Sequence, residues 1–153
     1  MHKKWMWIFA VWLIGFSALV QAQPEPALLT KKLPGKTMEQ VVQALKGAIA
    51  NHNYTFVREQ SIDSRLVPAD WEAKSVYIVY FCNFAKMHQA LAIDVRAAQF
   101  LPCRVTLIES KDGIDMTVVN PAWVSESLGN PLLHIDCLQL KADYLSIMDE
   151  VAL

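Results

Sequence analysis

The sequence lacks the short motifs that identify the common hydrolases, nucleotide-binding proteins and zinc proteases. It contains no G-x-S-x-G, no G-x-x-x-x-G-K-[ST], no H-E-x-x-H and no G-x-G-x-x-G. It also contains no C-x-x-C and no C-x-x-C-H, so covalent attachment of a c-type haem is not expected. We therefore expect a binding or accessory domain rather than an enzyme.

The sequence also lacks an excess of positive charge. It has 14 basic and 15 acidic residues, and two of the basic ones are Lys3 and Lys4. The part after residue 22 keeps 12 basic and 15 acidic residues, which is a net charge near −3. Because nucleic-acid binding needs a basic surface, we expect no nucleic-acid partner.

Long apolar runs are absent except at the N-terminus. Residues 5–20 form an uncharged run of 16 residues that follows Lys3 and Lys4 and ends at Val20-Gln21-Ala22, a suitable site for signal peptidase. The run is shorter than the roughly 20 residues that span a bilayer. We expect residues 1–22 to be a cleaved signal peptide and the mature protein to be periplasmic or secreted, with no stable membrane span after processing. Retention as an uncleaved anchor is the alternative.

The remaining chain is predicted to hold a disordered leader at residues 23–26 and one domain at residues 27–153. Strands are expected at residues 27–33, 54–59, 75–81, 103–109 and 114–120. Helices are expected at residues 37–51, from Asn83, from Asn120 to Gly129, and from Pro131 onward, and residues 67–74 are expected to form a loop. This order predicts an α+β fold with two layers, in which a mostly antiparallel sheet is covered by helices.

Cysteine is scarce, with Cys82, Cys103 and Cys137 in the mature part. An oxidising compartment permits a disulfide, and three cysteines permit at most one within the chain. Cys82 stands where a buried strand ends and a helix capped by Asn83 begins. The positive end of a helix dipole favours a thiolate there and would lower the pKa of the Cys82 thiol. From its position alone, the favoured interpretation is that Cys82 is a small apolar residue that fills space at the end of the strand.

Cys103 follows a connector, residues 93–102, that is long enough to bring it back to Cys82. A disulfide, a shared metal ion and a reactive dithiol are then all open. Arg96 and Arg104 are placed to hold an anionic ligand beside Cys82. The simplest interpretation of both arginines, and of Asp94 and Glu109, is that they are solvated or paired charges.

A soft metal ion is one candidate cofactor, with Cys82, Cys103 and His88 as its ligands, because thiolate and imidazole suit copper(I) and zinc. His88 shares a predicted apolar helix face with Phe84, Met87 and Leu91. The favoured interpretation is therefore that His88 is a half-buried structural residue. Cys137 lies on the apolar stripe of the final helix and is interpreted as a small core residue.

Several segments around these residues resemble one known family. They are Phe81-Cys82-Asn83-Phe84, Met87-His88-x-Ala90-Leu91, Asp94-x-Arg96, Phe100-Leu101-Pro102-Cys103-Arg104-Val105-Thr106, Glu109 and Asn120-Pro121. Together they resemble the bacterial domain of unknown function 302 family over roughly residue 33 to the C-terminus. Many members have Pro after the Cys-Asn pair, and Phe84 stands there as in the exported members.

The resemblance implies a compact α+β domain, leaves a homodimer open and implies no established activity. Cys82 and Cys103 match the family cysteine positions, and Cys137 does not. Three hypotheses follow. The first is an exported binding domain whose small ligand, or periplasmic protein partner, is held near Cys82, Asn83, Cys103 and Arg104. The second is a redox protein that cycles Cys82 and Cys103. The third is a protein-interaction domain with a structural disulfide.

Overall fold

The computed structural model describes residues 24–62 and 75–153. The predicted signal peptide and the predicted loop at residues 67–74 lie outside these residues. The described chain forms one five-stranded sheet in the order β1-β5-β4-β3-β2, and every neighbouring pair is antiparallel. The strands are β1 (Leu28–Pro34), β2 (Thr55–Ser61), β3 (Val76–Cys82), β4 (Cys103–Ser110) and β5 (Gly113–Val119).

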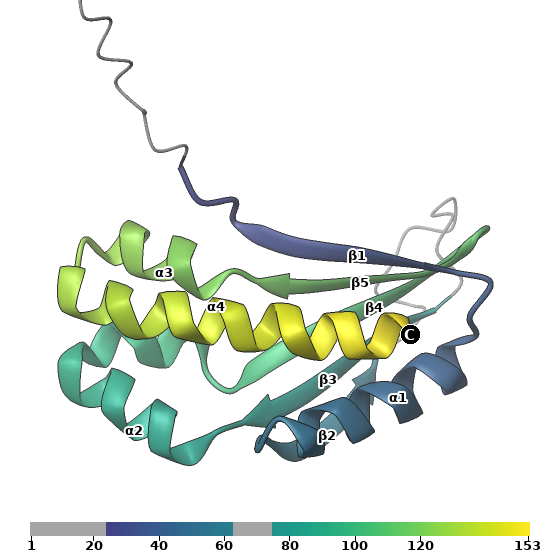
Figure 1. Ribbon diagram of the computed structural model, residues 1–153, viewed down its shortest axis with the longest axis horizontal. Helices are drawn as coiled ribbons and strands as arrows, with labels where there is room; N and C mark the ends of the chain where they lie inside the picture. The colour runs from purple at the N-terminus through teal and green to yellow at the C-terminus, as the bar shows by residue number, and fades with distance from the viewer. Residues whose placement is uncertain (1–23, 63–74) are drawn as a thin grey trace, which may run out of the picture.

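Helices cover one face of this sheet (Figure 1). They are α1 (Met38–Asn51), α2 (Phe84–Ile93), the 3-10 helix η2 (Val95–Phe100), α3 (Pro121–Leu128) and α4 (Pro131–Ala152). Successive strand residues alternate between the two faces, so every second residue of β5 faces the helices and is buried: Ile114, Met116 and Val118. The predicted two-layer α+β fold is confirmed.

Local signals in the sequence set the helix boundaries. At the start of α1, Gln40 N donates to Thr37 Oγ1 and Thr37 N donates to Gln40 Oε1, which is the predicted capping box. Asn120 accepts from Ala122 N at the start of α3, and Gly129 ends α3 in the left-handed conformation with φ of 65°. These ends form as predicted because each depends on residues within three or four positions.

The orientation of α2 was predicted wrongly. Phe84 is 52% exposed and His88 is exposed, although both were assigned to the buried face. The opposite side of the helix, with Ala90 and Ile93, packs against Ala97, Leu133 and Cys137. The reason is tertiary: α2 lies beyond the end of the sheet and packs against α4 and η2, so its inward face is the one that meets those helices (Figure 1).

None of the helices in residues 24–62 and 75–153 is long and apolar enough to cross a membrane.

Candidate functional site

Cys82 and Cys103 lie at the same end of the sheet, where β3 ends and β4 begins. The register pairs Phe81 with Cys103, so the side chains of these two residues lie on the same face. Cys82 is the next residue along β3, and strand alternation places its side chain on the opposite face. All three cysteines are free thiols. The two thiols are near enough to interact electrostatically, but they are not bonded to each other, and the register sets their side chains on opposite faces of the sheet.

Cys82 is a buried residue at the strand end, as the favoured interpretation expected, and the alternative of a lowered thiol pKa is not found. Cys82 is 2% exposed, and its Sγ lies 3.7 Å from Met87 Sδ. Burial raises the pKa of the thiol, so desolvation outweighs the helix dipole. The Asn83 side chain caps α2 by accepting from Lys86 N at 3.1 Å, and it donates to Asn53 O at 3.2 Å. Both hydrogen bonds stabilise the start of the helix rather than hold a ligand.

The predicted metal ligands are not brought together. His88 is exposed on the outer side of α2, whereas Cys82 is buried and Cys103 is half-buried at the end of the sheet. Within the two described stretches, no group of three or more His, Cys, Asp or Glu residues could hold a metal ion. The structure thus gives this ligand set no common site.

Arg96 and Arg104 match the simplest interpretation of them, since one is a paired charge and the other is exposed to solvent. Arg96 forms an ion pair with Asp94, in which Nε donates to Oδ1 at 3.0 Å and Nη2 donates to Oδ2 at 2.7 Å. It also donates to Leu128 O. These hydrogen bonds hold the pKa of Asp94 well below its usual range. Arg104 is exposed, and its pairing with Tyr80 turns its side chain away from the helices.

An apolar pocket lies on the helix side of this sheet end. Its volume is about 80 Å³. Its walls come from six elements, and the lining residues are Ala90, Ala97, Phe100, Leu101, Cys103, Arg104, Val118, Val119, Pro121, Val124, Leu133, Cys137, Leu140 and Tyr144. Apart from Arg104, whose side chain points to the other face, the polar side chains of the lining are the thiols of Cys103 and Cys137 and the hydroxyl of Tyr144.

These three groups carry no charge near neutral pH. Burial raises the pKa of Cys103 to about 11, although contact with the Tyr144 hydroxyl acts in the other direction. Burial likewise raises the pKa of Cys137, against a lowering contribution from Ser125. The pKa of Tyr144 is well above its ordinary value because the side chain is buried and lies beside Cys103. The pocket is therefore apolar and electrically neutral.

A polar groove between α2 and α4 continues from the pocket. Its volume is about 170 Å³, and it shares Ala90, Leu133, Cys137 and Leu140 with the pocket. The groove adds four polar residues: Lys86, Gln89, Asp136 and Gln139. Gln89 Nε2 donates to Asp136 Oδ2 at 2.8 Å across the groove. The two spaces together offer an apolar end and a polar end.

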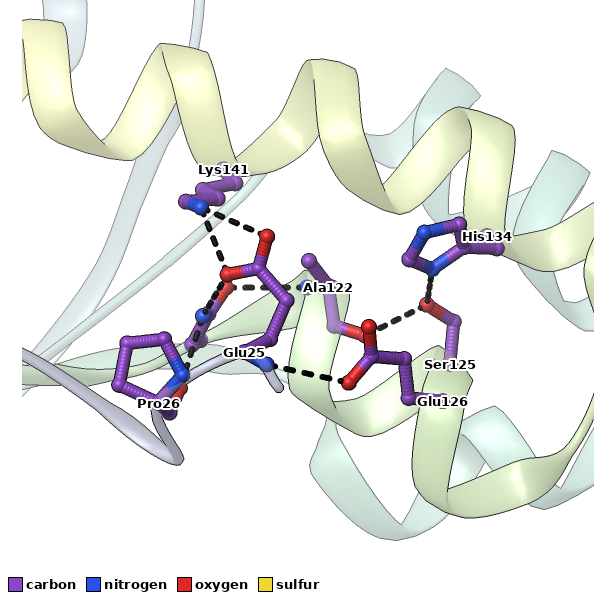
Figure 2. A network of polar contacts seen from close by, with 8 residues as sticks. Glu25, Pro26, Ala122, Ser125, Glu126, His134 and Lys141 are labelled. Carbon is purple, nitrogen blue, oxygen red and sulfur yellow. Dashed lines mark hydrogen bonds and ion pairs between the residues drawn. The ribbon is translucent and has the colours of Figure 1, made fainter. Parts of the chain in front are cut away.

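A polar network holds the wall of the pocket that α3 and α4 form (Figure 2). Lys141 Nζ donates to both carboxylate oxygens of Glu25, at 2.9 and 2.6 Å, and Asn120 Nδ2 donates to Glu25 Oε2 at 2.9 Å. Asn120 Nδ2 also donates to Pro26 O at 2.8 Å. Glu25 and Pro26 fall in the segment expected to be disordered, and these contacts instead fix them against both helices.

Ser125 and His134 form a second part of the same network. Ser125 Oγ lies 2.8 Å from His134 Nδ1 and donates to Ala122 O at 2.8 Å (Figure 2). A Ser–His pair can mark a nucleophile, but Ser125 is 0% exposed and does not line the pocket. The pair ties α3 to α4.

Sequence reasoning missed Cys137 and Tyr144 as site residues. Both lie on the buried stripe of α4 with Leu133 and Leu140, and that stripe has the same spacing as any core-facing helix. One sequence signal could have found them: Cys137 and Tyr144 lie seven residues apart and place a thiol and a hydroxyl on an otherwise apolar helix face.

Comparison with known proteins places the chain in a family. The model of "Domain of unknown function DUF302" matches residues 29–151. The chain belongs to the DUF302 family. Its structure is similar to that of an uncharacterized conserved DUF302 protein from Bacillus stearothermophilus, with a TM-score of 0.73 and 14% sequence identity. The match covers 82% of this chain and 98% of that one, and it shows the shared fold. No curated protein matches the chain.

Proposed function

We propose that this DUF302 domain is an exported binding domain that holds a small, uncharged and mainly apolar ligand in the pocket beside Cys103. The observation that carries the proposal is the pocket itself. It is lined by apolar side chains from helices and strands far apart in the sequence, and its few polar groups are neutral. Binding sites for small molecules commonly have this composition.

The dimensions set the size of the ligand. A water molecule needs about 10–15 Å³ of such space, and an engineered apolar cavity of about 150 Å³ in another protein binds benzene. A pocket of about 80 Å³ is smaller than that cavity, so a five-membered ring occupies it only with part of the ring in the adjoining groove. The adjoining groove between α2 and α4 has room for a polar remainder of the same molecule.

The neutral lining argues against a charged group inside the pocket. Moving an ion into an apolar site costs several kcal/mol unless a partner charge compensates. Lys86 borders the groove rather than the pocket and is paired with Asp143. Charged parts of a ligand therefore stay in the groove.

The other sequence-based hypotheses receive less support. A dithiol cycle needs a thiolate near neutral pH, and burial raises the pKa of both Cys82 and Cys103. A soft metal ion stays a prediction from residue types alone. Export rests on the signal-peptide pattern of residues 1–22, and a periplasmic protein partner remains a prediction.

Titration of the mature, isotope-labelled protein with cyclopentanone, followed by NMR, tests the proposal. We expect saturable shifts at residues that line the pocket. Ala90→Leu fills the mouth of the pocket and should weaken binding at least about tenfold, whereas Ala85→Leu, on the exposed side of the same helix, should not. Equal binding by both variants, or no saturable shift in the unmodified protein, would overturn it.

A further inference from the structure

Tyr144 brings a hydroxyl to the pocket from the middle of α4. The residue is 4% exposed and lines the pocket. Its ring makes edge-on contacts with Phe81, at 5.4 Å between ring centroids, and with Tyr54, at 6.4 Å. These aromatic contacts fix the ring, so the direction in which the hydroxyl points is fixed as well.

The hydroxyl of Tyr144 lacks a strong acceptor. Its neighbour is the Cys103 thiol, and no nitrogen or oxygen atom of residues 24–62 or 75–153 is its hydrogen-bond partner. Sulfur is a weak acceptor. The neighbouring Tyr54 shows the usual arrangement, because its hydroxyl donates to Asp143 Oδ2 at 2.7 Å. The one O–H of Tyr144 is therefore donated to a weak acceptor and would form a stronger hydrogen bond with an oxygen.

We propose that the ligand of the pocket carries a neutral carbonyl oxygen, as in a ketone, aldehyde or ester, which accepts a hydrogen bond from Tyr144. The proposal rests on the proposed function, since it names the chemical class that the same pocket takes. The ligand oxygen replaces the Cys103 sulfur as the partner of the hydroxyl, so a weak O–H···S contact is exchanged for an O–H···O bond. The apolar remainder of the ligand contacts Leu133, Val118 and Val124.

A carboxylate would accept the same hydrogen bond but is disfavoured. One neutral donor does not compensate for the desolvation of an anion. The nearest arginine of the lining, Arg104, has its side chain on the other face of the sheet. The phenol also stays neutral, since its pKa is raised well above the ordinary value. The pocket therefore selects a carbonyl over an acid of the same shape.

A matched pair of probes tests this class. Cyclopentanone and methylenecyclopentane have nearly the same shape, and they differ in that a carbonyl oxygen replaces a CH₂ group. The ratio of their dissociation constants is measured by NMR titration in the unmodified protein and in Tyr144→Phe. We expect the preference for the ketone, expressed as this ratio, to be about 2- to 10-fold smaller in Tyr144→Phe. This range corresponds to the loss of one neutral hydrogen bond.

Two further variants make the test decisive. Tyr80→Phe, on the opposite face of the sheet beside Arg58, should leave the ratio unchanged. Cys103→Ala removes the competing sulfur and should raise the preference for the ketone, which keeps the test valid even if Tyr144→Phe does not fold.

The outcomes separate the two proposals. Binding of both probes with the same ratio in the unmodified protein, Tyr144→Phe and Cys103→Ala would overturn the carbonyl inference and leave the pocket proposal standing. Tighter binding of cyclopentanecarboxylate than of cyclopentanone would also overturn it. Failure of every probe to bind the unmodified protein would overturn both.

Discussion

At the scale of single residues, burial decides how the titratable groups of the site behave. Cys103 and Cys137 line an apolar pocket, and a thiolate there would lose its hydration without gaining a cation. Both thiols therefore keep their protons at neutral pH. The same desolvation acts on Cys82, although a helix N-terminus follows it directly. The local sequence correctly indicates that a helix begins after Cys82. The burial that raises the pKa of the Cys82 thiol, however, depends on the whole fold.

The raised pKa of Cys103 predicts a loss of stability in alkali. The pKa is about 11 in the folded protein and 9.0 in the unfolded chain. Between these values the folded state binds more protons than the unfolded state, so the free energy of unfolding falls as pH rises from about 9 to 11. Urea unfolding at several pH values should show this fall. Cys103→Ala should show a smaller fall, and an equal fall in both proteins would contradict the assignment.

Two glycines make a matched pair for backbone geometry. Gly113 has φ of 143°, and a Cβ there would lie 2.2 Å from Leu33 O, whereas a Cβ on Gly47 in α1 would meet open space. We expect Gly113→Ala to destabilise the protein by more than about 1 kcal/mol and Gly47→Ala to stabilise it by about 0.5–1 kcal/mol. Thermal and urea unfolding measure both. A Gly113→Ala protein as stable as the unmodified one would refute the close approach of β1 to β5 at this position.

At the scale of elements, the strands and helix ends were predictable and the packing of α2 was not. The hairpin between β4 and β5, the capping box of α1 and the Asn120-Pro121 start of α3 each depend on a few adjacent residues. The buried face of α2 depends on where α4 passes, and no local spacing encodes that. The pocket was missed for the same reason, because its walls come from six elements that meet only in the folded chain.

Asn120 caps α3 and also holds the segment before β1, so it should be the most sensitive cap. It is fully buried, it accepts from Ala122 N, and it donates to Glu25 Oε2 and Pro26 O. Asn120→Ala should lower the free energy of unfolding by about 2–3 kcal/mol, because a cap and two buried hydrogen bonds are lost.

The control for Asn120 is Asn83→Ala, which removes the cap of α2 at a less buried site. It should cost about 1 kcal/mol. Urea unfolding at neutral pH compares the two variants. Equal losses would show that the contacts of Asn120 with Glu25 and Pro26 contribute nothing to stability.

At the scale of the whole molecule, we propose that a predicted export signal precedes a domain that binds a neutral ligand. Cleavage after Ala22 would leave a chain that begins at Gln23, two residues before the carboxylate that contacts Lys141. N-terminal sequencing of protein from the native cell fraction should find Gln23 first, in a periplasmic or secreted fraction. Recovery of the chain with Met1 intact in a membrane fraction would contradict export as a processed protein.

We propose that the space between the sheet end and α4 is a binding pocket for an apolar group. A crystal structure of the mature protein under xenon pressure tests this, because xenon enters apolar cavities without needing a hydrogen-bond partner. We expect an anomalous peak in contact with Leu133, Cys103 and Tyr144. A well-ordered structure in which side chains fill that space, or in which xenon binds elsewhere and leaves it empty, would show that it is not a binding pocket.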